Sequence, residues 1–463
     1  MSKQLKTISP IDGSEYVSRD YADQQQIESA LTTAASTQKA WARTPLKERQ
    51  AICSAMVDAF VANKEQIGEE LCWMMGRPIR YAAGEVAGME ERARYMIEAA
   101  SEALAPIELE EKSGFTRYIK REAVGVVFVI APWNYPYLTA INAIVPAILA
   151  GNTVILKHSA QTPLCAERLA EAFAAAGLPE GVFQYLHLTH QDTEAVIKAP
   201  EVEHVCFTGS VPGGAMVEQA AAGKFIGIGL ELGGKDPAYV RADADVDHAV
   251  ETTIDGAFFN SGQSCCGIER IYVDESIHDE FVAKAVALVK QYKLGRSDDQ
   301  ETTLGPVVKA SAAEFVRGQV EEAIAAGAKA WIDSAEFELN QQGTAYLAPQ
   351  VLTNVNHSMR VMTEESFGPV VGIQKVSSDK EAIELMNDSE FGLTASVFTR
   401  NIDAGVEIGE QLETGTFFVN RCDYLDPALA WTGVKNSGRG ATLSSVGFEH
   451  LTRAKSFHLK TEI

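Results

Sequence analysis

A cysteine on a glycine-rich turn and a carboxylate flanked by glycines are the residues of this chain best suited to chemistry. Cys265 lies in the segment FNSGQSCCG at residues 259–267, and Glu231 opens the segment ELGGK at residues 231–235. Glycines let the backbone approach a ligand closely, and a thiol with a carboxylate offers a nucleophile and a base. The two segments together predict covalent chemistry on a carbonyl carbon.

The cysteine has a second interpretation, because free cysteines usually fill apolar cores. The residues around it, from Gly262 to Gly267, indicate a turn and lack the apolar periodicity of a core segment. Adjacent side chains of a helix or strand point in different directions. We therefore expect only one of the two neighbouring cysteines, Cys265 rather than Cys266, to face a shared pocket.

The composition indicates a globular protein of two or more domains that avoids anionic partners. With 463 residues, the chain exceeds the size at which a single core usually stops growing. Its hydrophobic fraction of 46% is ample for burial, and 63 acidic against 40 basic side chains give a net charge of −23. Such a charge repels nucleic acid and anionic lipid, so neither is expected as a partner.

The seven cysteines favour a reducing cytoplasm. Their number is odd, and they lack the Cys-x-x-Cys or Cys/His spacings of zinc sites, so no metal is expected. The first residues lack the apolar core of a signal peptide. The apolar stretch 141–150 is too short to span a bilayer, and Pro146 should break it. We expect a soluble protein without a membrane partner.

The order of apolar segments predicts an α/β fold. The first part of the chain, to about residue 100, should be helical, with apolar positions at helical spacing in 51–60 and 67–75. Strands at 124–130, 153–156, 182–186 and 204–207 then alternate with helices at 138–149, 163–175 and 194–198. This alternation predicts a parallel sheet covered on both faces, which binds ligands beyond the carboxyl ends of its strands.

Three polar segments follow these strands directly. Residues 131–136 (APWNYP) on their own indicate a plain turn, and Lys157 in the segment 157–160 (KHSA) could reach a ribose or phosphate or lie in solvent. Residues 207–214 (FTGSVPGG) precede a helix and offer free backbone N–H groups to a phosphate, although such turns also serve as ordinary caps. Their glycine spacing differs from the common dinucleotide fingerprint. Taken singly, none of the three identifies a cofactor.

Taken together, the segments resemble the aldehyde dehydrogenase superfamily, nearly from end to end. The resemblance rests on residues 132–136 (PWNYP), 207–210 (FTGS), 231–235 (ELGGK), 262–265 (GQSC), 364–370 (EESFGPV) and 431–438 (WTGVKNSG), in the family's order. Any one of these could occur by chance, but the ordered set could hardly do so. The overall length and residues 420–427 resemble the short semialdehyde-type members, such as the succinate-semialdehyde dehydrogenases.

The resemblance implies oxidation of an aldehyde to a carboxylic acid with NADP or NAD. Cys265 would attack the aldehyde carbon as a thiolate, and the Asn134 amide with the backbone N–H of Cys265 would hold the oxyanion. Loss of hydride gives a thioester, which water activated by Glu231 would hydrolyse. Acylating members, which pass the thioester to coenzyme A, typically lack this base and are the ranked alternative. A non-catalytic scaffold is disfavoured because all three residues are present.

The same resemblance implies where the cofactor binds. Lys157 and Glu365 would hold its two riboses, and the other expected positions are Trp133, Ser159, Ala160, Gly209, Ser210, Gly214, Leu232, Gly233 and Phe367. NAD-preferring members often carry a glutamate where this chain has Ala160, and that carboxylate would repel a 2′-phosphate. We therefore hypothesise that NADP is accepted.

The aldehyde itself stays open between two classes. Arg421 could bind a substrate carboxylate through a bidentate pair or simply be solvated. Several succinate-semialdehyde enzymes carry an arginine on the helix after the Trp-Asn segment, where this chain has Asn142. Tyr135, Tyr137 and Trp431 could instead line an apolar tunnel for neutral aliphatic or aromatic aldehydes. We rank a semialdehyde such as succinate semialdehyde first.

The resemblance finally implies a domain plan. It comprises a Rossmann-type cofactor domain at 1–112 and 129–231, an α/β catalytic domain at 232–441, and a small β oligomerisation element at 113–128 and 442–463. Alternating residues at 116–121, and likewise at 454–460, predict strands with one apolar side. Exposed edge strands are usually paired or covered, so we expect a homodimer or homotetramer.

Overall fold

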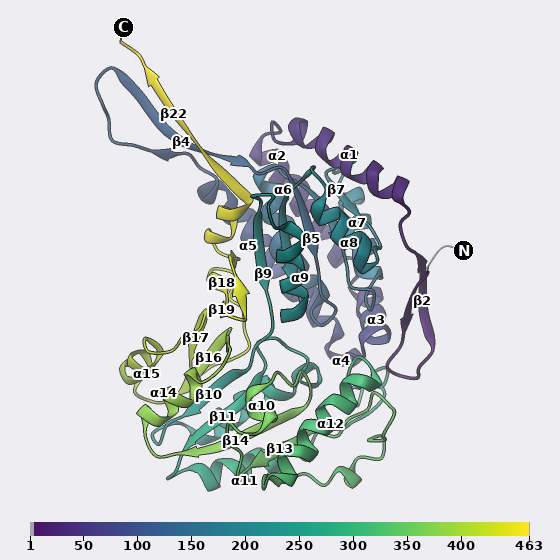
Figure 1. The fold of residues 1–463 in the computed structure, drawn as a ribbon, viewed down its shortest axis with the longest axis vertical. Helices are drawn as coiled ribbons and strands as arrows, with labels where there is room; N and C mark the ends of the chain where they lie inside the picture. Colours follow the sequence, from purple (N-terminus) through teal and green to yellow (C-terminus); the bar gives the residue numbers. More distant parts are fainter. Residues whose placement is uncertain (1–3, 463) are drawn as a thin grey trace.

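The fold consists of two large sheets, each covered by helices, and a narrow arm that projects from the body (Figure 1). The structure is a computed structural model and describes residues 4–462. No helix in that range is both long and apolar enough to cross a membrane.

Six strands form the first sheet, in the order β20-β9-β8-β5-β6-β7. They are β5 (Val126–Ile130), β6 (Thr153–Lys157), β7 (Phe183–Tyr185), β8 (Val202–Thr208), β9 (Gly227–Glu231) and β20 (Gly438–Arg439). All neighbouring strands from β9 to β7 run parallel, and β20 adds an antiparallel edge. The parallel sheet predicted from the sequence is confirmed.

Helices cover both faces of this sheet because its strands are apolar on both sides. They are α1 (Gln24–Trp41), α2 (Leu46–Val61), α3 (Lys64–Met75), α4 (Ile79–Ala82), α5 (Gly84–Ala103), α6 (Pro136–Ala150), α7 (Leu164–Ala175), α8 (His190–Lys198) and α9 (Val211–Ala221). Val127 and Val129 of β5 belong to the core that includes α2, α5, α6 and α7. Phe128 and Ile130 face the opposite core, with α1, α8 and α9. One strand thus organises both layers.

Two expectations for this half of the chain are wrong. The described part of the chain opens with a hairpin of β1 (Gln4–Ile8) and β2 (Glu15–Asp20) where helix was expected. Helix α6 also continues through Pro146, which was expected to break it. Proline removes one helix hydrogen bond and crowds the preceding turn. Because every residue from Ala140 to Ala150 is buried, packing against neighbouring elements holds the helix together.

Seven strands form the second sheet, in the order β12-β13-β14-β11-β10-β16-β17. They are β10 (Asp236–Val240), β11 (Ile268–Asp274), β12 (Lys329–Ala330), β13 (Gln350–Thr353), β14 (Val370–Val376), β16 (Thr394–Phe398) and β17 (Thr416–Val419). Its helices are α10 (Val246–Phe258), α11 (His278–Val289), α12 (Ala310–Ala325), α13 (Arg360–Thr363), α14 (Asp379–Asn387) and α15 (Ile402–Gly409). All pairs are parallel except β12 with β13, so this sheet also has both faces buried.

The arm is a three-stranded antiparallel sheet that stands away from the second sheet (Figure 1). It contains β3 (Ile107–Glu108), β4 (Phe115–Ala123) and β22 (Thr452–Lys460), and β22 pairs with the full length of β4. Both strands expected here are confirmed. The remaining short elements are β15 (Phe391–Gly392), β18 (Trp431–Thr432), β19 (Val434–Lys435), β21 (Ala441–Thr442) and the 3₁₀ helices η1 (Phe259–Gly262), η2 (Ser334–Glu336) and η3 (Val446–Leu451).

Candidate active site

The polar segments singled out in the sequence meet at one edge of the first sheet. Strands β5, β6, β8 and β9 are parallel, so their carboxyl ends share that edge. Asn134 follows β5, Lys157 ends β6, Ser210 follows β8, and Glu231 ends β9. Side chains far apart in the sequence are therefore brought to one place by strand order alone.

A cavity of about 280 Å³ at this edge is lined by both Glu231 and Cys265. Its other lining residues are Gly88, Glu91, Arg92, Tyr135, Leu138, Thr139, Asn142, Thr208, Asp255, Phe259, Ser264, Cys266, Asp423, Tyr424, Leu425 and Trp431. Asn134 lies beside it and donates from Nδ2 to the backbone oxygen of Gln263, 3.2 Å away. Glu231 and Cys265 thus line one cavity, and Asn134 is hydrogen-bonded to the turn that carries Cys265.

Packing forces the turn that carries Cys265 into an unusual backbone conformation. Three consecutive residues, 260–262, have positive φ angles of 53°, 57° and 72°. A Cβ at Gly262 would lie 2.2 Å from the backbone oxygen of Gly368, so only glycine fits there. Buried Gln263 hydrogen-bonds at both ends of its side-chain amide, to residues 260 and 308. The cysteine is therefore displayed on a rigid support.

The glutamate segment and the cysteine turn touch at Gly234. A Cβ at Gly234 would lie 2.2 Å from the backbone oxygen of Cys265, which excludes any other residue. The Gly234 N–H donates to the Glu365 carboxylate at 2.9 Å, and a Cβ at Gly233 would lie 2.6 Å from the same carboxylate. The two glycines let the segments pack closely. Burial raises the pKa of Glu365 to about 8.

Both cysteines line the cavity, so the expectation that only one of them faces it is wrong. They lie on a turn, where neighbouring side chains need not diverge as they do on a helix or strand. Cys265 is half-buried, whereas Cys266 is only 4% exposed and its thiol donates to Asp423 at 3.0 Å. A hydrogen bond with Cys265 and burial raise the pKa of Cys266 well above its ordinary value. Cys265 is the better nucleophile.

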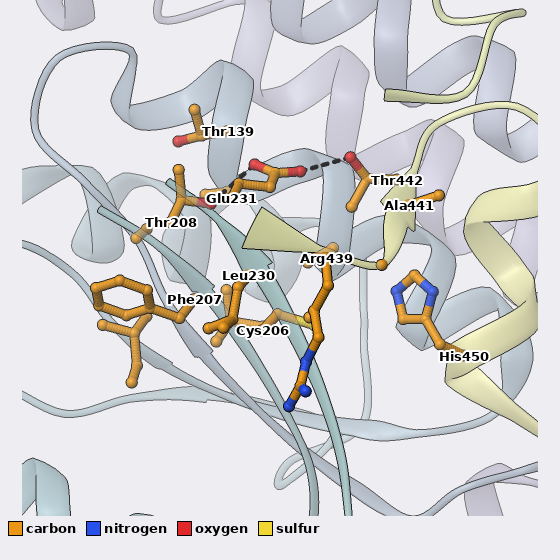
Figure 2. Close-up of a pocket in the computed structure, with 17 residues that line it drawn as sticks. Thr139, Cys206, Phe207, Thr208, Leu230, Glu231, Arg439, Ala441, Thr442 and His450 are labelled. Atoms are coloured by element: carbon orange, nitrogen blue, oxygen red, sulfur yellow. Dashed lines mark hydrogen bonds between the residues drawn. The ribbon is translucent and has the colours of Figure 1, made fainter. Parts of the chain in front are cut away.

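Two threonines hold the Glu231 carboxylate (Figure 2). Thr208 donates to one oxygen at 2.9 Å and Thr442 to the other at 2.6 Å. Burial raises the pKa of Glu231, while these hydroxyls and the charge of Arg92 oppose the rise. A carboxyl group with a raised pKa suits proton exchange with water near neutral pH. The sequence argument missed both threonines.

A buried ion pair positions the loop that carries Asn134. Arg77 pairs with Glu85, and its Nη2 donates to the backbone oxygen of Asn134 at 2.5 Å. The same Glu85 carboxylate accepts the backbone N–H groups of Tyr137 and Leu138, each at 3.0 Å, in the first turn of α6. A carboxylate satisfies free N–H groups there and is favoured by the helix dipole. This pair was also missed, since nothing in the sequence links its members to the loop.

Arg92 of α5 is the one cation among the described residues that line the cavity. Its Nη1 donates to the backbone oxygen of Leu138 at 3.0 Å and to Asn142 at 3.4 Å. It forms no ion pair with a carboxylate of residues 4–462, although it is only 8% exposed. Burial lowers its pKa, which nearby carboxylates partly offset. Arg421, considered from the sequence, instead lies over the Tyr424 ring in an adjoining cavity of about 130 Å³.

The aromatic residues expected to line a tunnel divide between the cavity and the core. Tyr135 and Trp431 line the cavity, but Tyr137 is fully buried against Phe60 and does not. Acidic groups also reach the cavity, and burial raises the pKa of Asp423 to about 7. The lining therefore combines aromatic rings, carboxyl groups and one guanidinium.

The expected cofactor positions lie along the same sheet edge. The Lys157 ammonium group makes no hydrogen bond or ion pair with residues 4–462, and burial lowers its pKa. Ala160 is exposed, and Ser159 accepts a hydrogen bond from the backbone N–H of Gln161 at 3.2 Å. An exposed alanine leaves room at this corner.

The turn after β8 has the form of a helix cap. Ser210 accepts a hydrogen bond from the backbone N–H of Gly213 at 3.3 Å, and Gly209 donates to the backbone oxygen of Glu231 at 3.0 Å. Gly214 lies under Leu232, where a Cβ would approach the leucine side chain to 2.8 Å. In the first turn of α9, Gly213 and Gly214 both donate to Ser210 and Pro212 has no N–H, so among the described residues only the Val211 N–H of this turn is left unpaired.

Trp133 and Phe367 meet edge to face, with ring centroids 5.7 Å apart. The two rings come from the segment after β5 and the segment before β14. Phe367 has a positive φ of 51°, which is rare for an aromatic residue. The contact joins the two sheets at the candidate site.

Comparison with known proteins gives one consistent result. Residues 1–457 match the model of the aldehyde dehydrogenase family. The chain is 33% identical over 443 residues to a succinate semialdehyde dehydrogenase of Escherichia coli K12 named with the cofactor NAD(P)+, a match that covers 95% of each protein. It is 32% identical over 454 residues to the NADP+ succinate-semialdehyde dehydrogenase 1 of Mycobacterium tuberculosis H37Rv, covering 98% of this chain and 99% of that protein. A solved succinic semialdehyde dehydrogenase from Streptococcus pyogenes in complex with NADP+ has a TM-score of 0.94 at 30% identity, covering 98% of this chain and 100% of that chain.

Proposed function

This chain belongs to the aldehyde dehydrogenase family, and from that premise we propose that it oxidises a short semialdehyde to the dicarboxylic acid, with NADP or NAD as the cofactor. The observation that carries the choice of substrate is Arg92, a buried cation in the same cavity as Cys265. The relatives named for succinate semialdehyde support the same class.

The chemistry follows from three side chains. The Cys265 thiolate bonds to the aldehyde carbon, and the Asn134 amide, which uses one N–H on Gln263, has a second N–H for the developing oxyanion. The bound cofactor supplies the hydride acceptor. Glu231 then takes a proton from the water that attacks the thioester, and the acid leaves as Cys265 is regenerated.

The residues present fit a dinucleotide. Lys157 is a lysine at a strand end with no protein partner among residues 4–462, so it is free for ribose hydroxyls. The Val211 N–H at the start of α9 is available to the pyrophosphate, and Glu365 supplies a carboxylate for the second ribose. Residue 160 is an alanine, and its side chain has no carboxylate that would repel a 2′-phosphate. This supports acceptance of NADP.

Arg92 fits the far end of a semialdehyde. Both of its hydrogen bonds use Nη1, so Nε and Nη2 remain as donors without a partner among residues 4–462, in a side chain that lines the cavity. Leaving a buried cation without a counter-ion is costly, and a bound carboxylate would relieve that cost. The neighbouring Asn142 helps to hold the guanidinium, which here comes from α5 rather than from α6.

A positively charged aminoaldehyde is the second candidate. Glu91, Asp255 and Asp423 also line the cavity and would attract an ammonium group. Burial raises the pKa of Asp255, and that of Asp423 to about 7, so both carboxyl groups lose negative charge readily. We therefore rank this candidate below the semialdehyde.

A panel of four-carbon aldehydes tests the proposal. Succinate semialdehyde, butanal and 4-aminobutanal differ at the far end, so kcat/KM measured by reduced-cofactor absorbance reports recognition of that end. The highest value is expected for succinate semialdehyde, with NADP accepted. A preference for 4-aminobutanal would favour the second candidate, and activity only with coenzyme A added would indicate the acylating alternative.

Assembly and location complete the proposal. The arm of β4 and β22 leaves strand edges exposed, which supports its use as an oligomerisation element in a homodimer or homotetramer. The cofactor and catalytic domains divide between β9 and β10, and the protein works in the cytoplasm. Light scattering on the protein, compared with a variant that lacks residues 453–463, tests the role of the arm.

A further inference from the structure

A small cavity adjoins the substrate cavity at Glu231, which lines both, and Figure 2 shows the residues around it. Its volume is about 20 Å³, enough for one ion or one water molecule. Cys206 of β8 and His450 of η3 line it, together with Gly229. The mechanism proposed above uses none of these three residues.

Three potential metal ligands cluster beside this cavity. One ligand atom from each of His204, Cys206 and His450 lies within 4.8 Å of the other two. His204 and Cys206 project from the same face of β8, since they are two residues apart on a strand. A tetrahedral zinc ion with bonds of about 2.0 to 2.3 Å holds its ligand atoms about 3.5 Å apart, so small side-chain rotations close the site.

The two imidazole rings have the separation that a shared ion requires. Their centroids lie 5.3 Å apart with an angle of 25° between the ring planes. Two histidines on one tetrahedral ion have centroids about 5 Å apart, given metal–nitrogen bonds of about 2.0 Å. The observed ring separation is therefore compatible with a shared ion.

Among residues 4–462, neither Nε2 of His204 nor the ring of His450 has a hydrogen-bond partner. His204 is 1% exposed, and its buried Nε2 makes no hydrogen bond. His450 also makes no hydrogen bond with residues 4–462, and its Nε2 faces the open space above Gly229. An unpaired buried polar group is costly, and simple ring stacking does not remove that cost. A bound ion would satisfy both rings.

The surroundings permit a cation. Arg439, the one cation among the described lining residues, pairs with Glu218. Cys206 would release its proton to solvent when its sulfur binds the ion.

We propose that His204, Cys206 and His450 form a binding site for one zinc-like divalent metal ion, with water as the fourth ligand. Two imidazoles and one thiolate suit zinc or cobalt better than magnesium or calcium, which prefer oxygen ligands. The ion would fasten β8 to η3, the element that leads directly into β22. It would also lie two register positions from the pair of Thr208 with Glu231, because Cys206 pairs with Gly229.

Cobalt binding tests the site independently of catalysis. The full chain carrying Cys265→Ser and Cys266→Ser, which removes the active-site thiols, is treated with a chelator, dialysed and titrated with Co²⁺. We expect about one equivalent per chain, with the visible bands of tetrahedral cobalt and a thiolate-to-cobalt charge-transfer band.

Further variants in this background identify the ligands. Cys206→Ser should abolish the charge-transfer band, and His450→Gln should weaken binding by more than about tenfold, since even loss of a hydrogen-bond partner of a ligand costs roughly that much. His190→Ala, at an exposed histidine, is the matched control and should bind as the parent does. Thermal unfolding of each variant, without and with cobalt, shows that the chain is folded. Absence of cobalt binding, or a spectrum unchanged by both ligand variants, would overturn the proposal.

Discussion

Replacing Arg92 by methionine should remove the preference for a carboxylate-bearing aldehyde while leaving the chemistry of Cys265 intact. Methionine keeps an unbranched, apolar stem of similar reach but has no charge and no donors. Arg92 is 8% exposed, so solvent screens its charge little. Its Nη1 bonds to Leu138 and Asn142 are also lost, which lowers stability without touching the reacting atoms.

The size of the effect follows from the donors that face the cavity. A hydrogen bond between a charged donor and its partner contributes about 1.5 to 3 kcal/mol. At about 1.4 kcal/mol for each tenfold change, kcat/KM for succinate semialdehyde should fall roughly 10- to 150-fold. Butanal has no carboxylate, so its kcat/KM should change by less than about threefold.

The assay compares reduced-cofactor absorbance with the two aldehydes for the parent, Arg92→Met and Arg421→Met. Arg421 lies outside the main cavity, over Tyr424, so its variant is the matched control and should keep the parent ratio. An equal loss with both aldehydes would show that Arg92 only supports α5 and α6. No loss with either would refute the role assigned to the guanidinium.

Three further predictions concern the cofactor, the base and the turn. Ala160→Glu should lower kcat/KM with NADP relative to NAD at least about tenfold, because a carboxylate opposes the 2′-phosphate; an unchanged ratio of the two would contradict this. Thr442→Val removes a hydrogen bond that lowers the pKa of Glu231, so the acidic limb of the kcat–pH profile should move to higher pH, and a shift to lower pH would be inconsistent with the base. Gly262→Ala should lower Tm, because the new Cβ would lie 2.2 Å from a backbone oxygen. The control Gly318→Ala, in open space on α12, should leave Tm unchanged or raise it. Equal changes in Tm for the two variants would show that the turn is not rigid.

The features predicted best from the sequence are those that a local pattern of residues determines, such as buried strands. Apolar runs such as Val126–Ile130 are buried on both faces, so their composition alone indicates a central parallel strand. Because parallel strands share one carboxyl edge, the segments after β5, β6 and β8 could be assigned to a common site before the structure was known. The role of each residue there still came from resemblance and remains a prediction.

Long-range contacts explain what the sequence did not show. Thr442 reaches Glu231 from 211 positions away, and Glu85 reaches the first turn of α6 across 52. Arg92 lies on an amphipathic helix where an arginine usually faces solvent, so its burial depends on how α5 packs on α6. The strands of the hairpin at residues 4–20 have the sequences QLKTI and EYVSRD, which do not alternate cleanly between apolar and polar residues.

The most direct test of the account is to trap the covalent intermediate. Glu231→Gln is mixed with succinate semialdehyde and NADP, quenched in acid, digested and analysed by peptide mass spectrometry. Without the base, hydride loss proceeds once and hydrolysis stalls, so the succinyl group should be found on Cys265. An acyl group on Cys266, or a burst of reduced cofactor with no acylated peptide, would contradict the assignment of Cys265 as the nucleophile and Glu231 as its base.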